Sequence, residues 1–291
     1  MENGKTKKPV KTWEELGLTD DFLFSKVMKD EKICKKLLET LLHTKIQKIV
    51  YLEEEKVVHI ALKSKGVRLD VYIESENRVF NIEMQAGCQA GLAKRSRYYQ
   101  SMIDLNILEA GEYYTKLKES YVIFICSFDP FGAKKAEYQF ENICLGEDHK
   151  PLRLGDQTKK IFFNAKAYMK AEDKDIQEFL KYVDGQPSDN PFVQEIENKV
   201  AEVKQVKEWR QEYMKTLLWE QDIRQEAWQE AWDEASKATE EKTRKEDIRK
   251  LIATLRLRNM PDDTIEELVM ETYHLTSEVA KSYLCGELAT S

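Results

Sequence analysis

A chain of 291 residues, 42% of them hydrophobic, is longer than the roughly 100–200 residues of one domain, so we expect two folded units. No apolar run approaches the ~20 residues that span a membrane, residues 1–11 form a basic polar tail, and none of the five cysteines lies in a C-x-x-C motif. We therefore expect a cytoplasmic protein with no membrane segment, disulfide framework or zinc site. The net charge of −7 comes from residues 186–291, with 23 acidic and 15 basic side chains, while residues 1–185, with 30 and 31, are close to neutral and compatible with nucleic-acid phosphates.

The first predicted element is an amphipathic helix that begins near Thr19 or Asp20, either of which suits a helix N-cap. Its spacing keeps one apolar face as far as residue 41, formed by Phe24, Val27, Met28, Ile33, Leu37, Leu38 and Leu41. Residues 48–52 and 57–62, which follow it, are typical of strands.

The next two strands are predicted to form a hairpin. Apolar and polar side chains alternate in residues 66–73 and 79–85, which is typical of strands buried on one face. A turn at residues 75–78 places Asp70 opposite Glu83 and sets apolar side chains opposite one another. A slip of one residue would turn each apolar row outward, so the hydrophobic pattern favours this register.

The polar face of this hairpin suggests a metal site. Directly opposed carboxylates repel each other, so Asp70 and Glu83 require a compensating positive charge. A hard cation such as Mg²⁺, with Mn²⁺ as the alternative, binds one or two carboxylates together with waters and a substrate phosphate. Gln85 would lie beside the ion, on the same strand face as Glu83. The alternative is that both carboxylates are solvated charges on an exposed face.

Further α/β elements follow the hairpin. Residues 92–108 are expected to form a helix that ends before Gly111, and the apolar run 121–126 predicts a central strand covered on both faces. Strands are also expected at 138–145 and 160–164, and a short helix at 175–183. Arg95, on the helix after the hairpin, could meet a phosphate or order the carboxylates; the alternative is a solvated arginine beside packed tyrosines.

A linker rich in glycine, proline and polar residues at 185–191 marks the expected domain boundary. Residues 192–258 contain no Gly or Pro and predict one long helix or a helical pair, including a short coiled-coil seam, with two or three short helices after it. The apolar stripe over residues 192–220 must be covered. We expect a homodimer through these residues, with packing back onto the first unit as the alternative.

Four blocks occur in a fixed order: residues 19–28, 68–71, 81–85 and 94–100, with 111–114 as a fifth. The order of acid, hairpin, Glu-x-Gln and helix resembles the PD-(D/E)XK nuclease superfamily. The local sequence is similar to the Rpn-type recombination-promoting nucleases, also called PD-(D/E)XK nuclease family transposases.

The resemblance implies a fold and two domains. It covers roughly residues 12–180 and implies an α/β restriction-endonuclease-like core, a mixed sheet flanked by helices, over residues 12–185. Residues 186–291 would form an all-α tail.

The resemblance also implies roles for single residues. Asp70 and Glu83 would bind the metal, and Asp21 would be an outer acid from the first helix, with Asp20 as the alternative. Gln85 stands where many relatives carry Lys. A neutral amide orients groups by hydrogen bonds but cannot supply the charge of Lys, so the identity of the general base stays open.

The expected function is Mg²⁺-dependent DNA endonuclease activity linked to recombination or a mobile element. Metal binding by two carboxylates would activate water and stabilise the charge that develops on the leaving oxygen. One alternative is a catalytically weak DNA-binding accessory protein of a mobile element, which Gln85 favours. Another is an interaction protein that acts through its helical tail.

Overall fold

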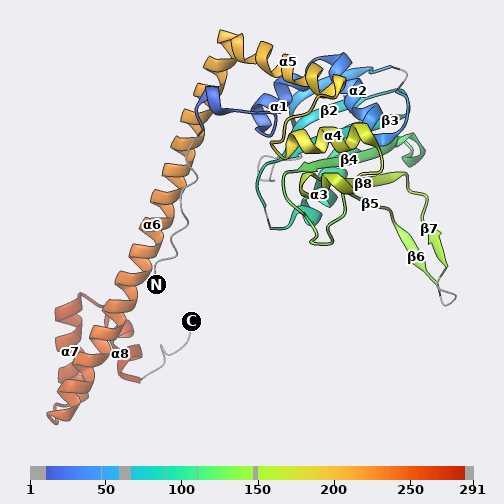
Figure 1. Ribbon diagram of the computed structural model, residues 1–291. Coiled ribbons are helices and arrows are strands. Elements are labelled where there is room, and N and C mark those ends of the chain that lie inside the picture. Colours follow the sequence, from blue (N-terminus) through green and yellow to red (C-terminus); the bar gives the residue numbers. More distant parts are fainter. Residues whose placement is uncertain are drawn as a thin grey trace. The chain divides into compact units, whose positions relative to one another are not determined.

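The computed structural model describes residues 11–46, 48–58, 67–88, 90–109, 111–146 and 150–285 (Figure 1). Contacts divide the chain into two units, Met1–Tyr213 and Met214–Ser291. The helices of the first unit are η1 Trp13–Glu15, α1 Asp21–Met28, α2 Glu31–Leu42, α3 Leu92–Ile107, η2 Tyr114–Lys116, η3 Ala165–Lys170, α4 Lys174–Val183 and α5 Pro191–Gln205. Its strands are β1 Tyr51–Val58, β2 Val67–Glu74, β3 Arg78–Gln85, β4 Glu119–Cys126, β5 Glu137–Phe140, β6 Ile143–Leu145, β7 Pro151–Arg153 and β8 Thr158–Asn164.

A six-stranded mixed sheet of order β1-β2-β3-β4-β8-β5 organises the first unit. β4 lies between two parallel neighbours, β3 and β8, and every residue after Glu119 in it is buried. This is the central strand that the apolar run at 121–126 predicts. α3 packs on β4, and α1 packs on β1, β2 and β3. The predicted fold class, a mixed sheet flanked by helices with a helical C-terminal region, is confirmed.

The β2–β3 hairpin has the register that the alternating pattern predicts. Val71 pairs with Ile82 and Ile73 with Phe80, across a turn between Glu74 and Arg78. β1 is one strand, Tyr51–Val58, where the sequence suggests two, at 48–52 and 57–62. Residues 59–62 of the second segment, and Gly66, lie outside the described residues.

The single helix expected from residue 20 to residue 41 is in fact two helices. α1 ends at Met28 and α2 begins at Glu31. The physical reason is Asp30, which leaves the helical conformation and caps α2: its Oδ1 accepts hydrogen bonds from the backbone N–H groups of Lys32 and Ile33 at 3.1 and 3.3 Å.

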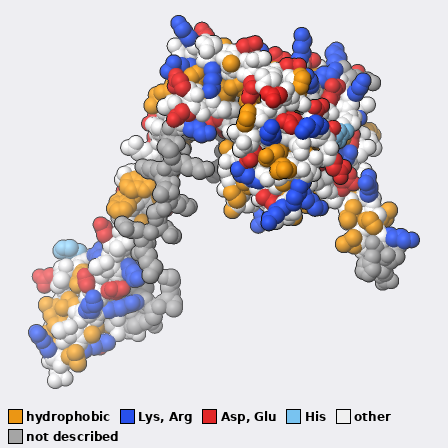
Figure 2. All heavy atoms as spheres, in the orientation of Figure 1, with side chains coloured by type: hydrophobic (Ala, Val, Ile, Leu, Met, Phe, Trp, Pro, Cys, Tyr) orange, Lys and Arg blue, Asp and Glu red, His pale blue; other side chains and the backbone are white. Residues whose placement is uncertain are grey.

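The segment expected as one strand at 138–145 belongs to two sheets. β5 pairs with β8 in the main sheet, whereas β6 pairs only with β7, in a two-stranded hairpin that projects from the sheet (Figure 1). Its apolar side chains are exposed, as the orange patch on this hairpin in Figure 2 shows; they are Ile143, Leu145, Leu152 and Leu154.

α5 packs onto the first unit. Val193, Ile196 and Val203 are fully buried, and the helix contacts α1 and α4. The side-chain amine of Lys199 also lies 3.1 Å from Asp30 at the start of α2. These contacts place the boundary between the units after Tyr213 instead of at the linker of residues 185–191, because the helix beyond the linker buries its apolar face against the sheet domain.

The chain also covers the end of this stripe. The ring of Tyr213 lies 5.6 Å from Trp13 and 5.4 Å from Phe22, between ring centroids. The homodimer expected through residues 192–220 assumes that the stripe is open to a partner, and this premise is wrong for the buried residues of α5 and for Tyr213. Dimerisation itself stays a prediction.

α6, Lys207–Leu257, continues into the second unit, where α7, Asp262–Tyr273, and α8, Ser277–Cys285, follow it. The core of this unit is formed by Ile248, Ile252, Ile265, Val269 and Ala280. The helical pair and the short helices predicted for the tail are therefore present. In the part of the chain that the structure describes, no helix is long and apolar enough to cross a membrane.

Candidate active site

The polar face of the β2–β3 hairpin lines a pocket of about 340 Å³. Asp70, Glu83 and Gln85 are 8%, 1% and 8% exposed, so these polar side chains are enclosed by protein and do not lie on an open surface. Asp21, at the start of α1, and Arg95, on α3, line the same pocket. The structure thus brings all five predicted site residues together.

Asp70 and Glu83 are fixed across the hairpin by reciprocal hydrogen bonds. The backbone N–H of Asp70 donates to Oε1 of Glu83 at 3.1 Å, and the backbone N–H of Met84 donates to Oδ2 of Asp70 at 3.0 Å. Each carboxylate therefore accepts from the backbone of the neighbouring strand. The register that the apolar residues enforce holds the two acids next to each other.

Arg95 supplies the nearest positive charge. Its Nη2 lies 3.2 Å from Oε2 of Glu83, in an ion pair whose carboxylate is 1% exposed. The guanidinium carbon lies 5.1 and 5.3 Å from the ring centroids of Tyr99 and Phe124. These aromatic contacts restrict the orientation of the guanidinium group, so that its N–H groups point towards the carboxylate of Glu83.

α1 begins at the wall of the pocket, and its two acids differ. Oδ1 of Asp21 accepts the backbone N–H of Phe22 at 2.9 Å. Asp20 occupies the N-cap position without a side-chain capping bond, and its Oδ1 is buried with no hydrogen-bond partner within the described ranges. Because Asp20 also lines the pocket, its carboxylate has an oxygen available to a ligand.

Burial shifts the protonation equilibria of the pocket. It raises the pKa of Glu83 to about 7, opposed by the charge of Arg95 and by hydrogen bonds from Asn81 and the Asp70 backbone. Burial and the nearby charge of Asp21 raise the pKa of Asp20 to about 6. In both cases the cost of burying the ionised carboxylate outweighs the groups that stabilise it, and a bound cation would add further compensating positive charge.

Asn81 is a site residue to which the sequence interpretation gives no role. It is fully buried two residues before Glu83, and its Nδ2 donates to Oε1 of Glu83 at 3.0 Å. The signal was available, because residues 81, 83 and 85 share one face of the strand. Asn81 therefore orients the carboxylate of Glu83 through a hydrogen bond from a neighbouring position on the same strand face.

The donor set of the pocket fits a hard divalent cation. In the described part of the chain, no group of three or more His, Cys, Asp or Glu side chains forms a complete metal cage. Two carboxylates are enough for Mg²⁺, because this ion keeps several waters and takes oxygens from a substrate phosphate. Asp70 and Glu83 are the residues that could hold it, and a cation there would compete with Arg95 for Oε2 of Glu83.

Comparison with known proteins agrees with this geometry. The family model of the PD-(D/E)XK nuclease family transposases matches residues 19–184, a segment that includes both strands of the hairpin, α3 and the start of α1. No match was found among curated proteins or among solved structures. The family model spans more than half of the chain, and the chain therefore belongs to the PD-(D/E)XK nuclease family transposases.

Proposed function

We propose that this protein is a Mg²⁺-dependent DNA endonuclease that hydrolyses phosphodiester bonds, in the service of recombination or a mobile element. The observation that carries the proposal is the enclosed pair Asp70 and Glu83, held together by bonds across the hairpin and lined by Arg95 and Gln85. Membership of a nuclease transposase family supports DNA as the substrate. PD-(D/E)XK nucleases generally use divalent metals, which supports the cation.

Each residue would have a distinct task. Asp70 and Glu83 would hold the cation, which when bound lowers the pKa of water and neutralises charge on the phosphate. Arg95 would provide a fixed positive charge for the phosphate, because its guanidinium could contact a phosphate oxygen and the carboxylate of Glu83 at the same time. Gln85 would orient the attacking water through its amide, since an amide can donate and accept hydrogen bonds.

The acid from α1 would complete the site. The family resemblance points to Asp21, and the buried, unpartnered oxygen of Asp20 supports Asp20 as the second candidate. Either carboxylate could accept hydrogen bonds from water molecules around the cation, a common arrangement for Mg²⁺.

A second candidate function rests on Gln85. Lys at this place would provide a charge to hold water or phosphate, and Gln provides only neutral hydrogen bonds. A protein that binds DNA with little cleavage, as an accessory factor of a mobile element, is consistent with this substitution.

Nicking of supercoiled plasmid DNA separates the two candidates. We expect the full-length protein to nick plasmid with Mg²⁺ or Mn²⁺ and not after chelation, and Asp70→Asn or Glu83→Gln to remove most of this activity. Calorimetry provides a measurement that does not depend on catalysis, and it should show that Asp70→Asn and Glu83→Gln also lose Mn²⁺ binding. Glu119→Gln is the matched control. Glu119 lies at the start of β4, beside Arg78 at the start of β3, whereas Glu83 lies near the other end of β3. The ion pairs of Glu119 are with Arg78 and Lys159.

The results divide as follows. DNA binding without metal-dependent cleavage would favour the accessory protein. Full cleavage by both Asp70→Asn and Glu83→Gln would refute the site.

A further inference from the structure

Two tryptophans are exposed one turn apart on α6. Trp228 and Trp232 are 61% and 58% exposed, and their rings stack with centroids 5.5 Å apart. Figure 2 shows apolar side chains gathered at the middle of this helix. A single exposed apolar residue is ordinary, but two adjacent indoles form a patch of the kind that marks an interaction surface.

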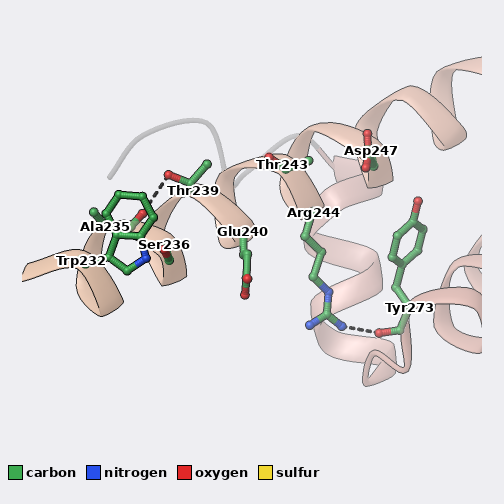
Figure 3. Close-up of a pocket in the computed structure, with 9 residues that line it drawn as sticks. All are labelled: Trp232, Ala235, Ser236, Thr239, Glu240, Thr243, Arg244, Asp247 and Tyr273. Carbon is green, nitrogen blue, oxygen red and sulfur yellow. Dashed lines mark hydrogen bonds between the residues drawn. The ribbon is translucent and has the colours of Figure 1, made fainter. Parts of the chain in front are cut away.

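A groove of about 670 Å³ begins at Trp232. In Figure 3 the indole of Trp232 stands at one end, and Arg244 and Tyr273 stand at the other, joined by a hydrogen bond from Arg244 to the backbone carbonyl of Tyr273. Between these ends α6 presents Glu240 and four small side chains; the small ones are Ala235, Ser236, Thr239 and Thr243. The groove exists because small residues lie between large ones along one helix face.

The same face of α6 therefore carries a projection, the indole of Trp232, and a hollow, the part of the groove beside Thr239 and Thr243. A second α6 that runs antiparallel, with a two-fold axis near Ser236, brings residue 232 of one copy opposite residue 240 of the other. The indole of Trp232 then enters the hollow beside Thr239 and Thr243 of its partner, and the reverse contact forms by symmetry. Large residues packed into holes between small ones are the normal packing of paired helices.

The charges of α6 favour the antiparallel arrangement. The acidic residues of segment 226–234 are Glu226, Glu230, Asp233 and Glu234, and it has no Lys or Arg. With the axis near Ser236, an antiparallel partner places segment 238–246 opposite segment 226–234. In segment 238–246 three basic residues, Lys242, Arg244 and Lys245, balance three acidic ones, Glu240, Glu241 and Glu246. Parallel copies would instead place the acidic segments 226–234 against each other, so the repulsion is smaller in the antiparallel arrangement.

We propose that the groove binds a second copy of this chain, in an antiparallel pairing of α6 helices in which Trp232 of each copy fills the groove of the other. The paired stretch that is symmetric about Ser236 and reaches the end of the groove at Asp247, residues 225–247, is about 33 Å long at 1.5 Å per residue. About three fifths of each tryptophan remains exposed, 61% of Trp228 and 58% of Trp232, out of the roughly 150–250 Å² that an aromatic side chain can bury. The two indoles therefore supply part of the ~800 Å² per partner that a stable interface buries. This surface is separate from the stripe at residues 192–220, and it does not depend on the nuclease function.

Sedimentation equilibrium of the full-length protein tests the proposal. We expect a dimer whose dissociation constant rises roughly tenfold or more in Trp232→Ala, because central tryptophans dominate interfaces. Thr243→Trp should weaken the dimer similarly by filling the hollow. Trp219→Ala is the matched control: Trp219 is 64% exposed but lies about 140° around the helix from Trp232, so the dimer should be unchanged. Far-UV circular dichroism confirms that each variant keeps its helix.

Cross-linking tests the direction of pairing. Gln229→Cys and Thr243→Cys, made in chains whose exposed Cys88, Cys144 and Cys285 are replaced by Ser, should form disulfides when mixed and not when each is alone. Self-cross-linking of each variant would indicate parallel helices and overturn the proposal. A monomer at all concentrations, or a dimer that neither Trp232→Ala nor Thr243→Trp weakens, would also overturn it and leave the groove to another occupant.

Discussion

Ile196→Ala tests whether α5 belongs to the sheet domain or to an interface between chains. Ile196 is completely buried on α5, in a helix that contacts α1 and α4. If α5 is part of the first unit, truncation of this side chain should destabilise that unit and leave the oligomeric state unchanged. If the stripe holds two chains together, the same change should weaken the dimer.

The expected magnitude follows from the burial. Replacing a fully buried Ile by Ala removes apolar area and leaves a cavity that closes only in part, which costs about 2–5 kcal/mol of unfolding free energy. For a unit of about 200 residues, each kcal/mol lowers the melting temperature by roughly 2–4 °C. A mid-range loss of about 3 kcal/mol therefore predicts a decrease of roughly 6–12 °C.

Differential scanning calorimetry, with sedimentation of the same samples, measures both outcomes. Leu218→Ala is the control, because Leu218 is 57% exposed on α6 and surface changes usually stay within about 0.5 kcal/mol. A loss below about 0.5 kcal/mol in Ile196→Ala, or a clear shift towards monomer, would refute the assignment of α5 to the first unit.

Three further predictions concern the pocket. Gln85→Lys should retain or raise plasmid nicking, and Gln85→Ala should lower it less than Asp70→Ala does, because an amide orients water while the carboxylates hold the cation; loss of metal binding in Gln85→Ala would contradict these roles. Asn81→Ala should weaken Mn²⁺ binding about 10–100-fold in calorimetry, the usual effect of removing a group that orients a ligand; unchanged affinity would mean that Asn81 only fills space. Asp20→Asn should raise stability at pH 8 by about 1–2 kcal/mol, allowing for partial exposure, and have no effect near pH 4. The sign follows because the pKa of Asp20, raised by burial to about 6, exceeds its unfolded value, so ionisation costs stability as pH rises from about 4 to about 6; urea denaturation at both pH values measures it, and equal stability at pH 8 would show that Asp20 is solvated.

The sequence predicts the hairpin well because its information is local. Alternation in two adjacent strands fixes which side chains face inward, and only one register keeps both apolar rows buried, so the neighbourhood of Asp70 and Glu83 follows. The break between α1 and α2 is harder to predict. Asp30 is a local N-cap signal, since its carboxylate accepts from the N–H groups of Lys32 and Ile33, two and three residues later. The apolar spacing continues across the break, however, and this continuity favours a single helix.

Packing between distant segments could not be predicted from a pattern. The stripe on α5 shows that something must cover Ile196 but not whether α1 or a second chain does so. The different environments of Asp20 and Asp21 could not be predicted either, because two adjacent acids at the start of a helix give the same sequence signal. In the folded chain Oδ1 of Asp20 is buried, whereas Oδ1 of Asp21 accepts the backbone N–H of Phe22.

Hydrogen bonds join the N-terminal segment around Trp13 to residues about 200 positions later, and they affect how the protein folds during synthesis. Nε1 of Trp13 donates to the carbonyl of Lys204, and the hydroxyl of Tyr213 donates to the carbonyl of Lys11, across separations of 191 and 202 residues. At synthesis rates of about 5–20 residues per second, the stretch from Gly185 to Tyr213 takes roughly 1–6 s. During that time α1 has its sheet partners but lacks the cover of α5. Asp20 and Asp21 line the pocket at the start of α1, so the helix that follows them is fully packed only after these late residues have left the ribosome.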